Sequence, residues 1–376
     1  MRSNIPTATE VARINALFPL MAALGSRWQA SKPFEGHIIA WNCHLTSLTA
    51  VSALALVKGG GQWVVSAANP ATTDPGVVSF MRQLGMEVFT GENGDRHLMA
   101  LARKPEILAD VGLDLIGAAL DRAPECLEHV VGGIEITASG VLRMAGRAFP
   151  FPLININDGE LKPAIENHHG VGEGTWQALS FVTGKHPAGR RVVVLGYGAV
   201  GKGVAQYGRA AGASVEVVEV DPIRRLKAHY DGFPTPPLSR VLAEAGIVVS
   251  ATGRSGVVTA EALASGKGDV VVANVGHWGD EIDVAGLARL CRPEPMGPDL
   301  KRYELGPERA VYVVTSGEPV NIVLNTGSPE PTLLHLALEG LTVEHLLGEG
   351  RLASPGVHLV PRGVESVAAE LALGAL

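Results

Sequence analysis

The stretch that most constrains the fold is residues 191–222, in which a strand, a glycine-rich turn, a helix and a second strand are expected in succession. Its first apolar run, residues 192–195, has the length of a strand. Gly196, Gly198 and Gly201 follow it in the spacing G-x-G-x-x-G. Glycines in this context are typical of a dinucleotide-binding β-α-β unit, whereas the same glycines alone would fit an ordinary turn.

Each part of this unit has a physical task. Gly196 makes the tight turn, Gly198 lets a pyrophosphate approach the helix N-terminus, and Gly201 lets helix and strand pack closely. Glu219, in the second strand, would accept hydrogen bonds from ribose hydroxyls and repel a 2′-phosphate. We therefore expect NAD rather than NADP, a preference that Arg224 and its neighbour slightly weaken.

Length and composition limit the class of protein. The chain has 376 residues, enough for two domains or more, and 46% hydrophobic with 18% charged residues indicates a globular protein. A net charge of −7 argues against nucleic-acid binding. No apolar run has membrane-spanning length, and Glu10 and Arg13 exclude a signal peptide. Three scattered cysteines predict a reducing, cytoplasmic setting with neither disulfides nor a metal site.

The residues before this unit alternate between strand-like and helix-like runs. Strands are expected at 36–40, 62–67, 87–89 and 114–116, and helices at 47–58 and 97–103. Such alternation predicts an α/β fold with two doubly wound parallel-sheet domains, the second a Rossmann domain. The expected division is residues 1–166 plus 330–350 for substrate, 167–329 for NAD, and a short C-terminal tail, 351–376.

Ligands of doubly wound sheets bind at the carboxyl ends of strands. His44, Thr46 and Asn69 follow two of the expected strands and therefore fall where a pocket should be. Asn274 also follows an expected strand, and both Asn274 and Asn321 could equally be loop-forming side chains.

Several separate stretches, in matching order and spacing, resemble the S-adenosylhomocysteine hydrolase (adenosylhomocysteinase) family over nearly the whole chain. They are Ala30-Ser31-Lys32-Pro33, Cys43-His44-Leu45-Thr46, Asn155-Ile156-Asn157-Asp158, Lys162, Asn167, Gly196-Tyr197-Gly198-Ala199-Val200-Gly201-Lys202-Gly203, Glu219-Val220-Asp221-Pro222, Asn274-Val275-Gly276-His277 and Val320-Asn321. The resemblance implies tightly bound NAD and a nucleoside-type substrate. That family oxidises the 3′-hydroxyl, removes the acidified 4′ proton, expels the 5′ substituent, adds water and reduces the ketone again.

The resemblance also implies roles for individual residues. Lys162 assists 3′-hydroxyl deprotonation with Glu166 as its partner, His44 serves the leaving group, and His277 bridges cofactor and substrate. The implied substrate-binding residues are Thr46, Leu48, Asn69, Glu135 and Ser328. The implied cofactor-binding residues are Thr137, Ser139, Asn167, Gly196, Gly198, Val200, Gly201, Glu219, Thr252, Asn274 and Asn321.

Departures from the family pattern gather in the substrate pocket. Leu48 stands where a glutamate reads the adenine amino group, and Ser328 where a histidine closes the base pocket. Beside Glu135, Ile136 replaces an acid that holds the ribose. The preceding strand is expected to end near residue 116, so the position of the family's catalytic aspartate falls on Ala118, and Asp121 could partly substitute for it.

Four functions follow from this pattern. The first is an NAD-dependent enzyme for a nucleoside other than S-adenosylhomocysteine; without water addition, it would be a nucleoside dehydratase. The second is a divergent S-adenosylhomocysteine hydrolase, the third a catalytically silent NAD-binding regulator, and the fourth a dehydrogenase using free NAD. The family forms homo-oligomers, so a dimer or tetramer is expected, although this chain lacks the basic tail that joins subunits.

Overall fold

The computed structural model describes residues 6–91, 95–277, 279–348 and 353–376, and divides the chain into two compact α/β units. The first unit is Met1–Lys162 with Pro329–Leu376, and the second is Pro163–Ser328. The expected boundaries lie slightly later in the chain. The expected separate C-terminal tail is instead part of the first unit, because its strand pairs with that unit's sheet.

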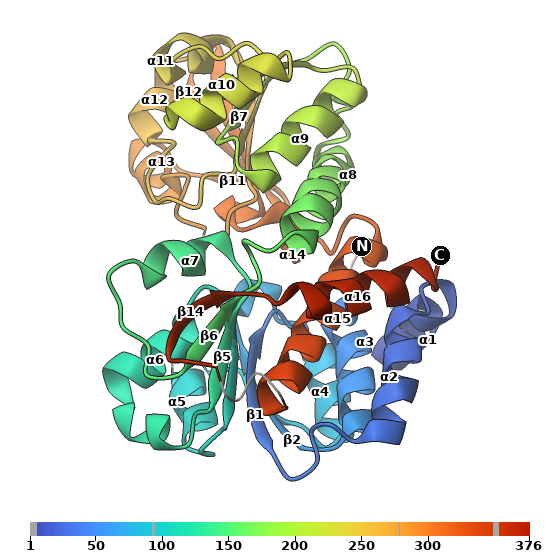
Figure 1. The fold of residues 1–376 in the computed structure, drawn as a ribbon. Helices are drawn as coiled ribbons and strands as arrows, with labels where there is room; N and C mark the ends of the chain where they lie inside the picture. The colour runs from blue at the N-terminus through green and yellow to red at the C-terminus, as the bar shows by residue number, and fades with distance from the viewer. Residues whose placement is uncertain (1–5, 92–94, 278, 349–352) are drawn as a thin grey trace. The chain divides into compact units, whose positions relative to one another are not determined.

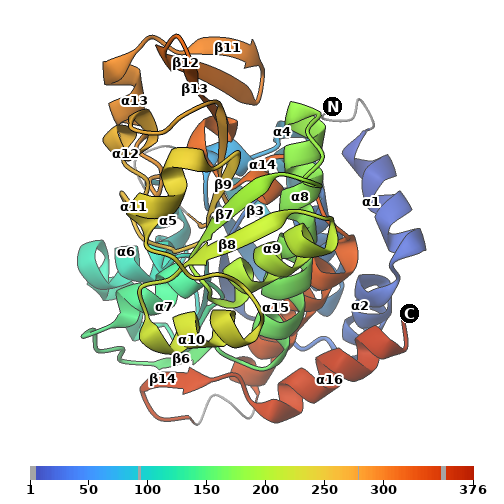
Figure 2. The ribbon, with the colours of Figure 1, turned by 90° about the horizontal axis from the view of Figure 1, so that it is seen from above.

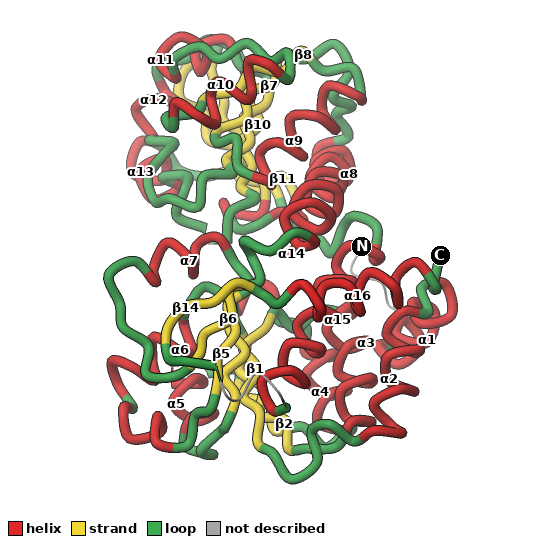
Figure 3. The backbone as a smooth tube through the Cα atoms, viewed as in Figure 1, coloured by secondary structure: helices red, strands yellow, loops and turns green. Residues whose placement is uncertain are grey.

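The first unit has a parallel sheet of seven strands between two layers of helices (Figures 1 and 3). The strand order is β14-β6-β5-β4-β1-β2-β3. Its strands are β1 Ile38–Cys43, β2 Gln62–Ala67, β3 Glu87–Phe89, β4 Ile107–Asp110, β5 Gly132–Glu135, β6 Pro152–Asn155 and β14 Gly356–Leu359. Most of these strands are buried along their length, as expected for a sheet covered on both faces.

Helices α2, α3 and α15 cover one face of this sheet, and α5 and α6 cover the other. The helices of the unit are α1 Thr7–Leu17, α2 Leu20–Ser31, α3 Ser47–Leu56, α4 Pro75–Gln83, α5 Asp95–Leu101, α6 Asp114–Arg122, α7 Ala138–Met144, α15 Pro329–Leu347 and α16 Arg362–Leu373, with short 3₁₀ turns at Val57–Gly59, Pro70–Thr72 and Pro124–Glu128. Because the helices shield both faces, the polar ends of the strands are the places where a ligand can meet them.

One expected strand is wrong. Residues 114–116 begin helix α6, and the strand of this region is β4, which ends at Asp110. Short apolar runs have no period that separates strand from helix, and Leu115 and Ile116 are buried on the core-facing side of the helix. The shift moves the carboxyl end of the strand from the neighbourhood of Ala118 to Asp110.

The second unit confirms the predicted Rossmann-type sheet, with strand order β11-β12-β13-β10-β9-β7-β8 (Figure 2). Its strands are β7 Arg191–Leu195, β8 Ser214–Val218, β9 Ile247–Ser250, β10 Val270–Asn274, β11 Glu294–Gly297, β12 Leu300–Gly306 and β13 Arg309–Val314. Only the pairings of β12 with β11 and β13 are antiparallel among the described strands. Along β7, Val192 and Val194 pack into one core and Val193 into the other.

Two layers of helices supply these cores. The helices of the unit are α8 Val171–Thr183, α9 Ala199–Ala210, α10 Pro222–Tyr230, α11 Leu238–Val241, α12 Ala260–Ala264, α13 Val284–Leu290 and α14 Val320–Val323, with 3₁₀ turns at Leu242–Glu244 and Thr315–Gly317. A π-helix, Lys162–Gly170, joins the first unit to α8. No helix among the described residues is long and apolar enough to cross a bilayer.

A carboxyl group is buried between α15 and β1 in the first unit. Glu339 is 3% exposed and accepts a hydrogen bond of 3.0 Å from Trp41 Nε1. Burial raises the pKa of Glu339 from its ordinary 4.5 to about 8, and the nearby Asp110 adds to the rise. The folded protein therefore keeps this proton to a higher pH than the unfolded chain.

Replacement of this acid should change how stability depends on pH. Between about pH 4.5 and 8 the folded state binds the extra proton, so the Glu339 contribution to the free energy of unfolding falls as pH rises. We expect Glu339→Gln to become increasingly more stable than the wild type across that window, by at most about 1.4 kcal/mol per pH unit. Urea unfolding at several pH values measures this difference.

Glu344→Gln is the matched control on the same helix. Glu344 also accepts a hydrogen bond from an indole, Trp28 Nε1 at 2.9 Å, but 23% of its side chain is exposed. A difference between the wild type and Glu339→Gln that stays constant from pH 5 to 8, as it does for a simple change of side chain, would contradict the buried-proton interpretation.

Candidate functional site

The polar residues of the first unit meet where its strand order reverses. From β1 the chain proceeds to β2 on one side, and β4 lies on the other side. Asn42 near the end of β1 donates through Nδ2 to Asp110 Oδ1 at 2.8 Å and to the Val111 carbonyl at 3.2 Å. Such switch points, at the carboxyl ends of strands, are where doubly wound sheets bind their ligands.

Asp110 is the acid at this point, and the sequence analysis did not select it. Its carboxylate also accepts from the Val111 and Ile116 amides, at 2.8 and 2.7 Å. Burial, followed by the negative charge of Asp114, raises the pKa of Asp110 to about 7, while the Asn42 hydrogen bond opposes the rise. A group that titrates near neutral pH is suited to accept and return protons.

The position of Asp110 corrects the expected loss of an acid at Ala118. An acidic, glycine-containing segment follows the strand after all, from Asp110 through Gly112 to Asp114. Ala118 lies inside α6 and packs against the core. The alternative acid, Asp121, is 58% exposed and pairs with Arg147 at 3.1 Å.

Glu135, at the end of β5, shapes the turn that follows Asp110. Its carboxylate accepts from the amides of Gly112 and Leu113 at 3.1 and 2.7 Å, and from the amide and hydroxyl of Thr137 at 2.7 and 2.5 Å. It is fully buried, and burial together with Asp110 raises the pKa of Glu135 to about 8. These contacts make Glu135 a support for the loop; its predicted contact with substrate is untested.

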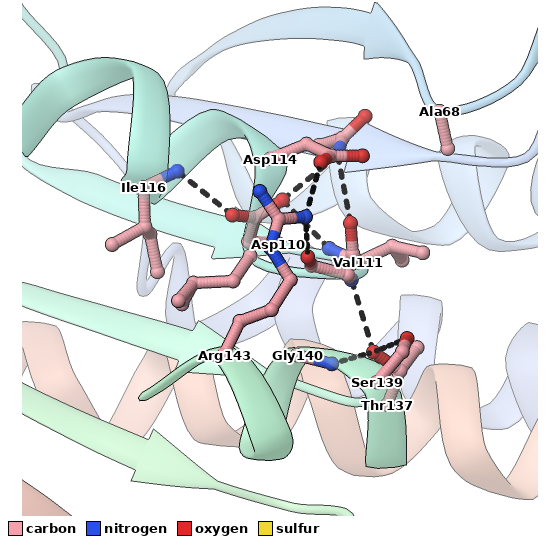
Figure 4. Close-up of polar contacts among 12 residues, drawn as sticks. Ala68, Asp110, Val111, Asp114, Ile116, Thr137, Ser139, Gly140 and Arg143 are labelled. Atoms are coloured by element: carbon pink, nitrogen blue, oxygen red, sulfur yellow. Dashed lines mark hydrogen bonds and ion pairs between the residues drawn. The ribbon is translucent and has the colours of Figure 1, made fainter. Parts of the chain in front are cut away.

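The end of this network joins helix α7 (Figure 4). Thr137 Oγ1 lies 3.1 Å from Ser139 Oγ and accepts from the Gly140 amide at 3.0 Å, which caps the helix. Arg143 donates to Asp114 at 2.6 Å and also to the Gly112 carbonyl. The structure thus brings Thr137 and Ser139 to the Asp110 loop of the first unit, and their predicted contact with the cofactor stays a prediction.

His44 has a defined tautomer. Its Nδ1 lies 2.7 Å from Thr72 Oγ1, and this hydroxyl donates to the Asn69 carbonyl at 3.0 Å. Since the hydroxyl hydrogen is used, Nδ1 carries the proton and donates, which leaves Nε2 as the basic nitrogen. The Asn69 side chain accepts from the Ala71 amide at 2.8 Å, so it builds the loop that holds His44.

Thr46 and Leu48 lie at the start of α3. Thr46 is the N-cap, and its amide donates to Thr49 Oγ1 at 2.9 Å while its own Oγ1 faces the Thr49 amide at 3.5 Å. A reciprocal cap of this kind fixes the first turn of a helix. Leu48 follows in that turn and is half-buried, so an apolar side chain occupies the position expected to read the base.

Lys162 begins the π-helix, and Glu166 and Asn167 follow within it. π-Helical segments are rare and are frequently found at functional sites. Lys162 is 7% exposed, and its charge lowers the pKa of Glu339 in the first unit. The lysine is therefore in electrostatic reach of Glu339, which also interacts with Asp110, and it is no solvated surface lysine.

The second unit has its own switch point, between β7 and β9, and the glycine turn lies there. Gly196 has φ +93°, and a Cβ on it would lie 2.7 Å from the Ala251 carbonyl oxygen. A Cβ on Gly201 would lie 2.1 Å from the Gly196 carbonyl oxygen, so only glycine fits. Gly198, the N-cap of α9, has open space, as an approaching pyrophosphate requires. Val200 lies in the first turn of that helix.

Glu219 directly follows β8, as a ribose-binding acid should. Its carboxylate accepts from the amides of Tyr197 and Asp221, at 2.7 and 2.9 Å. These bonds fix the carboxylate beside the glycine turn, and each oxygen can accept more than one hydrogen bond. The residues present therefore fit the adenosine ribose of NAD.

A buried acid that the sequence analysis missed orders the remaining loops of this edge. Glu281 is 1% exposed and accepts from the Thr252 amide and hydroxyl at 3.0 and 2.7 Å and from the Gly253 amide at 2.8 Å. A Cβ on Gly276 would lie 1.7 Å from its carboxylate. Asn274, which is fully buried, accepts from the Gly276 amide at 2.7 Å.

Three further predicted residues, Asn321, His277 and Ser328, fall in the second unit. The buried Asn321 Oδ1 has no hydrogen-bond partner in the described structure. A hydrogen-bond donor on a bound cofactor would satisfy this oxygen. His277 follows the β10 loop and is half-buried. Ser328 donates its amide to Glu173 at 3.1 Å, and because it belongs to this unit while Leu48 belongs to the first, their joint base pocket stays a prediction.

The two glycines of the turn should respond differently to alanine. Gly201→Ala forces a side chain against a backbone oxygen, so we expect it to destabilise the protein by about 1–3 kcal/mol and to lose NAD. Gly198→Ala meets nothing closer than 3.8 Å and should keep wild-type stability yet retain less NAD. Thermal unfolding and the NAD content of purified protein measure both, with Gly363→Ala as the control. Equal loss of stability in both variants would contradict the division of roles.

Comparison with known proteins agrees with this site. A family model described as S-adenosyl-L-homocysteine hydrolase, NAD binding domain, matches residues 167–327. S-inosyl-L-homocysteine hydrolase of Methanopyrus kandleri is 33% identical over 94% of this chain and 87% of that protein. Adenosylhomocysteinase of Thermoplasma acidophilum is 32% identical over 94% of this chain and 90% of that protein. The chain therefore belongs to the S-adenosylhomocysteine hydrolase family, and its cofactor is NAD.

Proposed function

We propose that this protein hydrolyses a nucleoside thioether of the S-nucleosyl-homocysteine class by internal oxidation and reduction. The observation that carries the proposal is Asp110, a buried acid titrating near neutral pH at the switch point of the unit that also holds His44 and Lys162. Bound NAD would take a hydride from the 3′ carbon and later return it. The chain's own residues then have to move protons.

In the proposal Lys162, His44 and Asp110 move the protons. Lys162, with Glu166 as its partner, takes the proton of the 3′-hydroxyl and returns it when the ketone is reduced again. The 3′ ketone makes the 4′ C–H bond acidic. His44 Nε2 takes the 4′ proton, the thiolate leaves the 5′ carbon, and His44 passes the proton to the thiolate. Asp110 accepts the proton of the water that adds to the 5′ carbon and returns it to the 4′ carbon. His277 positions the substrate.

A hydrolase is favoured over a nucleoside dehydratase, which omits water addition. A missing acid at Ala118 would be compatible with a dehydratase, because no group would accept the proton of an added water. Asp110 supplies an acid and removes that argument. Relatives matching 94% of the chain are also named hydrolases. Loss of a 5′ hydroxyl as water remains the alternative, and its product would have no 5′ oxygen. A silent regulator would need neither Lys162 nor His44.

We further propose that the enzyme accepts a substrate with hypoxanthine as its base at least as readily as one with adenine. Leu48, which is half-buried, offers no acceptor to an exocyclic amino group. A site without that acceptor cannot select strongly for the amino group. The names of two relatives, from Methanopyrus kandleri and Methanothermobacter thermautotrophicus, carry S-inosyl-L-homocysteine as substrate.

Assembly and location are predictions as well. We propose a homo-oligomer, dimer or tetramer, in a reducing cytoplasm. All three cysteines are described, and each is a free thiol. Light scattering coupled to gel filtration would measure the assembly.

A spectrum at the NADH absorbance band tests the proposed chemistry. We expect purified protein to show transient reduction with S-inosyl-L-homocysteine and to release homocysteine. S-adenosyl-L-homocysteine and 5′-hydroxyl nucleosides form the comparison panel. No NADH signal with any member of the panel would overturn the proposal, and a 5′-deoxy product without homocysteine would establish the dehydratase.

Single substitutions should separate the two halves of the reaction. Lys162→Met should abolish NADH formation, whereas Asp110→Asn should keep NADH formation and the first release of homocysteine, and slow formation of the hydrated nucleoside by about 10²–10⁴-fold. Asp121→Asn, on the exposed face of α6, is the control and should behave like the wild type. If Asp110→Asn lost NADH formation as completely as Lys162→Met, Asp110 would have to act in the oxidation step.

A further inference from the structure

A line of buried polar side chains leads away from Asp110 across the first sheet. His97 Nδ1 lies 3.0 Å from Ser66 Oγ, and Ser66 Oγ lies 3.5 Å from Asn42 Oδ1. Asn42 Nδ2 in turn donates to Asp110 at 2.8 Å. The four side chains come from α5, β2, β1 and β4, and none is more than 4% exposed. Buried polar groups in such a line are costly unless each has a partner.

The direction of these hydrogen bonds follows from chemistry. Asn42 uses its amide hydrogens on Asp110 and the Val111 carbonyl, so its Oδ1 must accept. Ser66 is the donor to that oxygen, which uses the only hydroxyl hydrogen. His97 must therefore carry its proton on Nδ1 and donate to Ser66. The line is a directed series of donors that ends on the Asp110 carboxylate.

We propose that Asn42, oriented by Ser66 and His97, is a positioning residue that fixes the Asp110 carboxyl and keeps it ionised, so that it is ready to accept a proton. This inference rests on the proposed function, in which Asp110 accepts the proton of water. Asn42 is fully buried and acts on the substrate only through Asp110. None of the stretches that carry the family resemblance includes Asn42, Ser66 or His97.

The charges around Asp110 explain why a donor is needed. The charge of Asp114 on α6 makes the ionisation of Asp110 harder, in addition to burial. The charge of Asp110 in turn raises the pKa of Glu135 on β5 and of Glu339 on α15. The Asn42 amide acts in the opposite direction by donating to the ionised form.

His97 itself does not titrate in the working range. Burial, together with the charges of Arg96 and Arg122, lowers the pKa of His97 to about 3. The ring is thus neutral at any pH at which the enzyme is assayed. A change in the pH profile on mutation would then report Asp110 rather than His97.

The experiment compares substitutions that remove or keep the donor. Asn42→Ala removes it and should lower kcat roughly tenfold, leave KM nearly unchanged, and move the acidic limb of the kcat profile up by about one pH unit. His97→Leu should move it in the same direction by less, because the Ser66–Asn42 link is the longest. His97→Asn places an amide N–H near the position of Nδ1 and should restore the wild-type profile.

A purely structural role gives a different result. In that case Asn42→Ala and His97→Leu lower stability or kcat with no shift of the acidic limb, and His97→Asn is as impaired as His97→Leu. Either finding overturns the proposal. Carboxyl ¹³C NMR titration of Asp110 in full-length wild type and His97→Leu provides a readout without turnover, should Asn42→Ala not fold; an unshifted titration also overturns it.

The same data separate this inference from the proposed function. A wild type that never forms NADH with the substrate panel refutes the proposed function, whereas the NMR titration still decides whether the line of donors tunes Asp110. The ¹⁵N signals of His97 should show a proton on Nδ1, and a proton on Nε2 alone would refute the directed line.

Discussion

The burial of carboxylates at the ends of parallel strands is the constraint on which this structure depends. An ionised carboxyl loses its hydration there, and it is tolerated only where N–H and O–H groups replace the lost water. Glu135 and Asp110 meet this demand with the amides of the loops that follow β4 and β5. Each acid therefore specifies the path of a loop, and the loops in turn place the polar groups of the site.

The second unit uses the same device for a different chemistry. Glu281 gathers the amides and hydroxyl that follow β9 and approaches Gly276 after β10 so closely that no larger residue fits there. Glu219 fixes the glycine turn through the Tyr197 amide. Neither Glu281 nor Glu219 has a proton-transfer role in the proposed mechanism. Both acids hold the backbone in the shape that a dinucleotide needs.

Sequence patterns predicted the second unit better than the first, for a physical reason. The run from β7 to β8 combines a period, glycines of fixed spacing and a terminal acid, so each signal restricts the others. Around Asp110 the apolar runs are short, and a short apolar run fits a strand as well as the first turn of a helix. Asn42, His97 and Glu339 carried no local signal at all, because what makes them polar partners is contact across strands that are distant in the sequence.

The corrected strand end also changes how the reaction should be understood. With an acid absent, elimination could finish only by reduction, and water addition would have no proton acceptor. Burial and the charge of Asp114 raise the pKa of Asp110 toward neutral pH, and the hydrogen bond from Asn42 limits that rise. In the mechanism that we propose, Asp110 therefore exists in both protonation states during turnover. Loss of the Asp114 charge or of the Asn42 donor would move the pKa of Asp110 away from that range. The proposed hydration step thus depends on the same burial of carboxylates that costs the fold stability.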